Sequence, residues 1–106
     1  MPSFTFDLTE EAIDYTLKSI KDMPGNNGQQ QLIDNLEIDA YCIAKVDISS
    51  NFDVDVETQY DIKFNSSHPE AIDIILNTAE ESFVEFSERI DSFTDVIDMA
   101  FQEFLG

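Results

Sequence analysis

Alternation of apolar and polar residues marks the middle of the chain. Apolar side chains occupy every second position from Ile38 to Ile48, and again from Val54 to Phe64 with Thr58 as an exception. This period of two is typical of strands that bury one face. The residues between the two segments, 49–51, are Ser-Ser-Asn, which favour turns. The pattern predicts a long antiparallel β-hairpin with one buried face and one wet, mostly acidic face.

Apolar residues at helical spacing lie on both flanks of this hairpin. One stripe follows Thr9, the expected N-cap, and continues to about Met23, where Pro24-Gly25 ends the helix. A second stripe runs through residues 70–105. It predicts either one long helix or two helices joined near Asp91-Ser92.

These elements predict one α+β domain over residues 1–106. The N-terminal helix is followed by the hairpin, and the long or broken C-terminal helix packs on the sheet. Residues 3–8 alternate as well, so they form either a third strand or an extended arm. The length suits a single domain, and a hydrophobic content of 42% is enough for a core.

The net charge is more informative about function than any motif in the sequence. The chain has 23 Asp and Glu against 5 Lys and Arg, a formal net charge of −18. Self-repulsion on this scale destabilises a compact state. Nucleic acid and anionic membranes are poor partners for such a surface, because both are polyanions. Basic proteins or cations are the partners that the charge favours.

Catalytic and cofactor motifs are weak in this sequence, so we expect a non-enzymatic protein without a cofactor. Asp53, Asp55 and Glu57 resemble metal ligands, but the interleaved valines explain their spacing more simply as the outer face of a strand. His68, the single histidine, precedes a proline where a helix is expected to begin. Cys42, the single cysteine, falls on the apolar side of its strand, so we expect a buried thiol.

The acidic pattern is the strongest remaining signal. On the last helical region, acids step by three or four residues, which keeps them on one side of a helix. An ordinary solvated helix mixes charges, whereas Arg89 is the one base in residues 70–106. A solvated face alone would explain the run less well than a binding surface. The expected partner-binding residues, in the hairpin and in the last helical region, are Asp53, Asp55, Glu57, Asp61, Asp73, Glu80, Glu81, Glu88, Asp91, Asp95 and Asp98.

In size, net charge and carboxylate rows, the chain resembles the small DNA-mimic inhibitors carried by phages, which include anti-restriction and anti-CRISPR proteins. The resemblance implies that the rows at Asp53–Asp61 and Asp73–Asp98 occupy the groove of a basic nucleic-acid-binding protein. Phe52, Tyr15 and Tyr41 are candidate apolar anchors for such a contact. The resemblance covers no alignable motif, so it transfers no functional residue.

Two alternatives stay open at this point. The first is an immunity protein or antitoxin that neutralises a basic nuclease toxin. The second is an oligomeric scaffold or chaperone-like protein, with a homodimer formed through the Phe-rich C-terminal helix.

The N-terminus lacks the basic and apolar regions of a signal peptide, so the cytoplasm is the expected location, namely the host cytoplasm for a phage protein.

Overall fold

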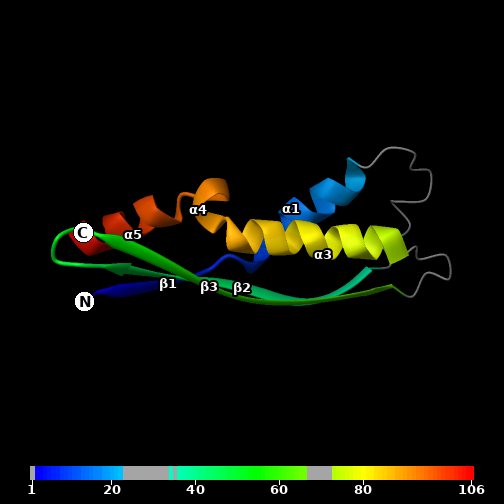
Figure 1. The fold of residues 1–106 in the computed structure, drawn as a ribbon, viewed down its shortest axis with the longest axis horizontal. Coiled ribbons are helices and arrows are strands. Elements are labelled where there is room, and N and C mark those ends of the chain that lie inside the picture. Colours follow the sequence, from blue (N-terminus) through cyan, green and yellow to red (C-terminus); the bar gives the residue numbers. More distant parts are fainter. Residues whose placement is uncertain (1, 23–33, 35, 67–72) are drawn as a thin grey trace.

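A computed structural model gives the fold of residues 2–22, 34, 36–66 and 73–106 (Figure 1). The predicted α+β class is confirmed. The elements in chain order are β1 (Ser3–Asp7), α1 (Thr9–Lys21), β2 (Leu36–Ile48), β3 (Val54–Ser66), α3 (Asp73–Glu88), α4 (Ile90–Phe93) and α5 (Val96–Leu105).

The three strands form one antiparallel sheet in the order β1-β2-β3. The predicted hairpin is confirmed, with Cys42 opposite Tyr60 in the β2–β3 register. The first residues form a third strand rather than an arm, because Phe4 lies opposite Val46 on β2. A one-residue slip would turn every apolar side chain to the other face, so the alternation opposes such a slip.

The helices cover a single face of the sheet, and the structure has two layers (Figure 1). The even-numbered residues of β2, from Cys42 to Ile48, point toward the helices and are fully buried. Phe83 of α3 and Val96 of α5 meet them from the helical layer and are also fully buried. The alternation of the strands thus separates a covered inner face from an outer face that carries polar and charged residues.

The C-terminal region is broken into three helices, so the broken helix, rather than the continuous one, is the predicted alternative that is confirmed. α3 ends at Glu88, the short helix α4 follows after Arg89, and α5 begins at Val96. Thr94 has extended backbone angles, and its hydroxyl donates a hydrogen bond of 2.7 Å to the carbonyl oxygen of Ile90. The break therefore falls on both sides of α4, which itself contains the expected joint.

Thr9 does not cap α1 as the sequence suggested. The residue before the helix is Leu8, and it makes no side-chain capping bond. The Thr9 hydroxyl donates to Asp7 Oδ1 at 2.6 Å and accepts the backbone N–H of Cys42 at 3.0 Å. Thr9 therefore fastens the turn between β1 and α1 to the central strand.

The molecule is a rod rather than a sphere. Its principal extents are 54 × 22 × 19 Å, and its radius of gyration is 16.5 Å. A compact domain of this length would have a radius of gyration of about 13 Å. The long strands, and α3, α4 and α5 laid end to end over them, give the rod its length (Figure 1). A chain of this size therefore exposes more surface than a sphere would.

Candidate acidic interaction surface

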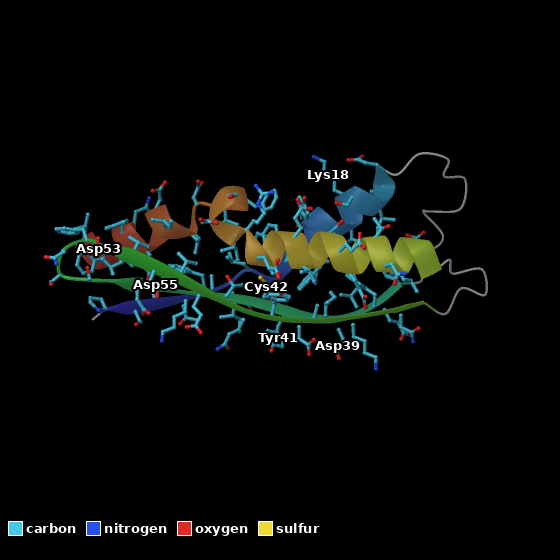
Figure 2. All side chains as sticks on the ribbon, viewed as in Figure 1. Lys18, Asp39, Tyr41, Cys42, Asp53 and Asp55 are labelled. Carbon is cyan, nitrogen blue, oxygen red and sulfur yellow. The ribbon has the colours of Figure 1, made fainter. Side chains whose placement is uncertain are left out.

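The outer face of the sheet is the first candidate surface. No helix in the described part of the chain covers it, and Figure 2 shows Asp39 and Tyr41 pointing away from the helical layer. We call this surface the outer sheet face. Its charged residues, from the three strands, are Asp7, Glu37, Asp39, Lys45, Asp47, Asp55, Glu57, Asp61 and Lys63.

The strand register decides which of these charges are balanced. Lys45 lies opposite Glu57, and Asp39 lies opposite Lys63. Opposite charges at such positions are favourable. Asp47 and Asp55, in contrast, face each other directly, and like charges at directly opposed positions are destabilising. The Ser3 hydroxyl donates a hydrogen bond to Asp47 Oδ1, which stabilises one carboxylate of this pair.

Apolar groups interrupt the carboxylates at two places. Tyr41 is 46% exposed near the middle of the outer sheet face, beside the half-buried Ile43. Phe52 is 58% exposed at the hairpin turn and packs edge-on against Phe104 at a ring distance of 6.0 Å. Phe52 also has a positive φ of 63°, a conformation that is strained for a bulky residue. These two aromatic rings are the sequence-predicted anchors that the structure leaves accessible.

Tyr15, the third predicted anchor, packs within the helical layer. Its ring packs against Phe86 and Phe93 at 5.6 and 4.8 Å, and its hydroxyl donates to Glu85 Oε2 at 3.3 Å. Partial burial and the nearby carboxylate raise the pKa of Tyr15. The Tyr15 side chain therefore contributes mainly to the packing of α1 on α3.

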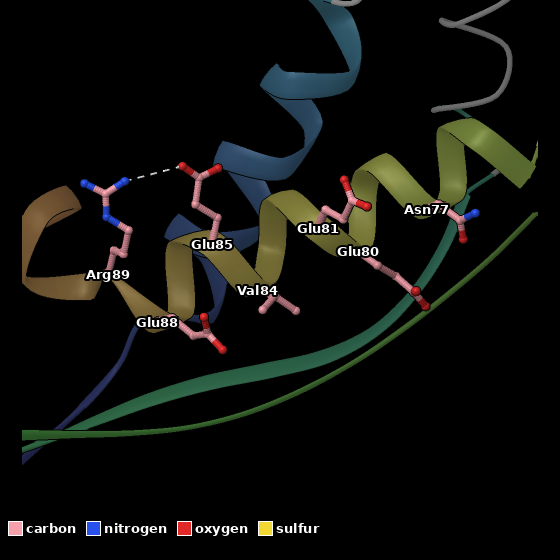
Figure 3. Close-up of a pocket in the computed structure, with 7 residues that line it drawn as sticks. All are labelled: Asn77, Glu80, Glu81, Val84, Glu85, Glu88 and Arg89. Atoms are coloured by element: carbon pink, nitrogen blue, oxygen red, sulfur yellow. Dashed lines mark ion pairs between the residues drawn. The ribbon is translucent and has the colours of Figure 1, made fainter.

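The helical layer carries the second candidate surface. A groove of about 530 Å³ runs along α3, and Figure 3 shows its lining. Val84 forms the apolar floor between Glu80 and Glu88, while Glu81 and Glu85 lie along the other flank. We call this the α3 groove, and its lining residues are Asn77, Glu80, Glu81, Val84, Glu85, Glu88 and Arg89.

Two carboxylates of the α3 groove already have partners. Glu85 accepts the Tyr15 hydroxyl and pairs with Arg89 at 3.7 Å. Glu88 accepts the hydroxyl of Tyr60, on β3, at 3.0 Å, and this bond raises the pKa of Tyr60. Glu80 and Glu81 are exposed and make no bond with the described residues. The groove thus combines two anchored carboxylates with two that are available to a partner.

The structure separates the two predicted acidic rows onto opposite sides of the rod. The hairpin residues Asp55, Glu57 and Asp61 are exposed on the outer sheet face, and Asp53 is exposed at the hairpin end. The helical residues are divided among α3, α4 and the region of α5, and the Asp73 side chain lies outside the described part. The remaining exposed members of the helical row are Glu80, Glu81, Glu88, Asp91, Asp95 and Asp98.

Asp7 is a member of the outer sheet face that the sequence prediction missed. The alternation of Phe4 and Phe6 could have placed it there, once the strand had been assigned. Hydrogen bonds from the hydroxyl and the backbone N–H of Thr9 lower the pKa of Asp7. Asp7 therefore stays negative at neutral pH and extends the acidic face onto β1.

Other sequence candidates have simpler outcomes. Cys42 is fully buried, as expected, and accepts a hydrogen bond from the Ser87 hydroxyl at 3.3 Å. His68 lies outside the described residues. Within the described ranges, no group of three or more His, Cys, Asp or Glu side chains has the geometry to hold a metal ion. In the same ranges, no helix has the length and apolarity needed to cross a membrane.

The Phe-rich helical region is mostly used inside the single chain. Phe83 and Phe86 are buried against the sheet and α1, so they are not available to a second copy. Phe93 is 37% exposed and lies under the Arg89 guanidinium, 5.6 Å from the ring centre. The homodimer remains a prediction, and its remaining apolar contacts are Phe93, Phe101 and Phe104.

Comparison of the chain with protein-family models, with curated proteins and with solved structures gave no match.

Proposed function

We propose that this protein is a non-enzymatic inhibitor that presents an acidic, nucleic-acid-like surface to a basic nucleic-acid-binding protein. The observation that carries the proposal is the distribution of carboxylates around an elongated rod. Exposed acids lie on the outer sheet face and on the opposite helical side, with few bases between them. A groove that normally holds the phosphates of a nucleic acid is the complement of such a rod.

The spacing of the carboxylates supports this proposal. Along β3, Asp55 and Glu57 are separated by about 6.6–6.8 Å, since alternate residues of a strand share a face. Across the sheet, opposed side chains such as Asp47 and Asp55 are separated by about 5 Å. The rows thus form a two-dimensional array of negative charge at a scale of several ångströms. A basic groove can engage such an array at several points at once.

Folding stability alone does not account for the positions of these carboxylates. The opposed Asp47 and Asp55 are unfavourable for the sheet. Glu85 and Glu88 lie in the last turn of α3, where the helix dipole disfavours negative charge. Residues that oppose folding at several places are expected where a binding role retains them. A partner with Lys and Arg side chains at these positions would relieve the repulsion and associate rapidly.

The exposed aromatic rings supply the second part of a specific contact. Tyr41 lies among the carboxylates of the outer sheet face, and Phe52 is exposed in the turn between β2 and β3. Electrostatic attraction gives association rate and orientation, whereas aromatic anchors in pockets give much of the affinity. The outer sheet face combines both features, so we assign it the principal role.

Two sets of substitutions on opposite sides of the rod test the proposal. One set neutralises Asp53, Asp55 and Glu57 to Asn or Gln, and the other changes Glu80, Glu81, Asp91 and Asp95 to Ser. Glu88 is left intact because it holds Tyr60. Binding partners are captured from the source cell, or from the host of a phage, at low salt, and the variants are compared for competition with DNA or RNA. The hairpin set should weaken binding more than the helical set.

A further inference from the structure

The backbone of β3 offers a site that the charge pattern alone does not reveal. β3 is the terminal strand of the sheet, and among the described residues no strand pairs with its far side. The open edge of this 13-residue strand presents a row of N–H and C=O groups that can pair with another chain. The hydrogen-bond pattern of β2 shows which residues of β3 point outward.

Cys42 uses its carbonyl and its N–H on the β1 side, where they contact Leu8 N–H and Thr9 Oγ1. Ile48 also points its N–H to that side, toward the carbonyl of Pro2. Even-numbered residues of β2 therefore face β1, and odd-numbered residues face β3. Through the register, odd-numbered residues of β3 pair with β2. The outward N–H and C=O groups of β3 belong to Val54, Val56, Thr58, Tyr60, Ile62 and Phe64.

A hydrogen bond at Ile62 supports this assignment. Its N–H is held by Asp61 Oδ1 at 2.9 Å, an adjacent side chain rather than a backbone carbonyl. The inner side chains of β3 are also less covered than those of β2. Val54, Val56 and Ile62 are half-buried, whereas Val46 and Ile48 are completely buried. On the open side of β3, the backbone groups therefore lack a strand partner among the described residues, and the inner side chains are incompletely buried.

The side chains along this edge select the occupant. Asp55, Glu57 and Asp61 lie on its outer face, and only Lys63 carries a positive charge there. A second copy paired through β3 would bring two molecules of net charge −18 together. A strand with Lys or Arg at alternate positions would instead place bases opposite Asp55, Glu57 and Asp61. Charge complementarity therefore favours a basic strand.

The α3 groove adds to the same site. The bond between Tyr60 and Glu88 places this flank of α3 beside β3, and α3 runs along the strands. Glu80, Val84 and Glu88 share one side of the helix because they are four residues apart (Figure 3). A strand added beside β3 would place its inner side chains below Val84, between two carboxylates.

We propose that the outward edge of β3 binds an extended basic segment of the partner as a fourth strand. The segment has Lys or Arg on one side and apolar residues on the other. The backbone would supply affinity and the alternating side chains would supply specificity. This inference rests on the proposed function, since it names the part of the basic partner that docks.

Amide hydrogen exchange with a synthetic probe tests the proposal. The probe is a capped peptide of alternating lysine and valine, and its control has the same composition with all lysines grouped at one end. The alternating peptide should slow exchange at Val56, Thr58 and Tyr60, and leave the odd-numbered amides, which already pair with β2, unchanged. The grouped peptide should not produce this alternation, although it carries the same charge.

Thr58→Pro removes one outward N–H while preserving the ladder with β2, because an edge strand tolerates proline on its open side. It should weaken binding of the alternating peptide about tenfold. Thr58→Val keeps the N–H and should bind as the wild type does. If Thr58→Pro fails to fold, the exchange pattern of the wild-type chain decides alone.

Three other results would overturn the proposal. Equal binding of the two peptides without alternating protection would overturn strand addition and leave the acidic-surface proposal intact. Absence of binding by either peptide at low salt would also overturn strand addition. Concentration-dependent protection of the even-numbered amides without peptide would assign the edge to a second copy and overturn the basic occupant.

Discussion

Asp47 and Asp55 lie directly opposite each other on the outer face of β2 and β3. Asp55→Asn should raise the free energy of unfolding by roughly 0.2–1 kcal/mol, because it removes the repulsion between two like charges. Thermal unfolding at low and high salt measures the effect, which should shrink as salt screens the charges.

Glu57→Gln is the matched control for Asp55→Asn. Glu57 is the next residue of the same strand on the outer sheet face, but it lies opposite Lys45 instead of an acid. Its neutralisation should therefore leave stability unchanged or lower it by a few tenths of a kcal/mol. Equal stabilisation by both variants would show that general charge reduction, and not the opposed pair, is responsible.

The bond between Tyr60 and Glu88 predicts a specific loss of stability in alkali. The hydrogen bond to Glu88 raises the pKa of Tyr60, so the folded state favours the neutral phenol. The contribution is complete below the unfolded tyrosine pKa of about 10 and is lost as the pH rises through the higher folded value. Denaturant unfolding from pH 8 to pH 11 should show a smaller alkaline decline for Tyr60→Phe. Tyr41→Phe, on the outer sheet face, should keep the wild-type profile.

Cys42 should be unreactive in the folded protein. Its side chain is fully buried beside Ser87, and burial raises the pKa of the Cys42 thiol, so little thiolate is available to a reagent. Labelling with an aromatic disulfide should be slow in buffer and rise in step with global unfolding by denaturant. Rapid stoichiometric labelling in buffer would place Cys42 outside the core.

The positive φ of Phe52 predicts an inverted order of two substitutions. Phe52→Gly and Phe52→Ala both remove the contact with Phe104, but only glycine adopts a φ of 63° without strain. The glycine variant should be more stable than the alanine variant by about 1 kcal/mol. Both variants should bind the basic partner more weakly, because both lack the exposed ring. An alanine variant as stable as the glycine variant would remove the argument that Phe52 is held under strain.

Much of the fold follows from the alternation of apolar residues. The period of two from Ile38 to Phe64 determines the hairpin and its buried face, because a one-residue slip would expose the apolar side chains. The breaks around α4 were harder to predict, since the apolar spacing continues through them. They depend on the backbone of Thr94 and on tertiary packing, neither of which the periodicity encodes.

The candidate site was predictable in composition and not in arrangement. The acidic residues and their exposure follow from the wet faces of the strands and helices. Their division between two sides of the rod depends on the helices covering one face of the sheet only. Two bonds join residues that are far apart in sequence, namely Glu85 with Tyr15 and Glu88 with Tyr60. No local sequence pattern predicts them.

Competition with nucleic acid for the captured partner tests the proposed function most directly. A labelled DNA or RNA bound to that partner is titrated with the wild-type protein and with the Asp53, Asp55 and Glu57 neutralised variant. The proposed function predicts displacement of the nucleic acid by the wild type, weaker displacement by the variant, and a loss of both with increasing salt. Stable binding of the protein to its partner together with an undisplaced nucleic acid would contradict the claim.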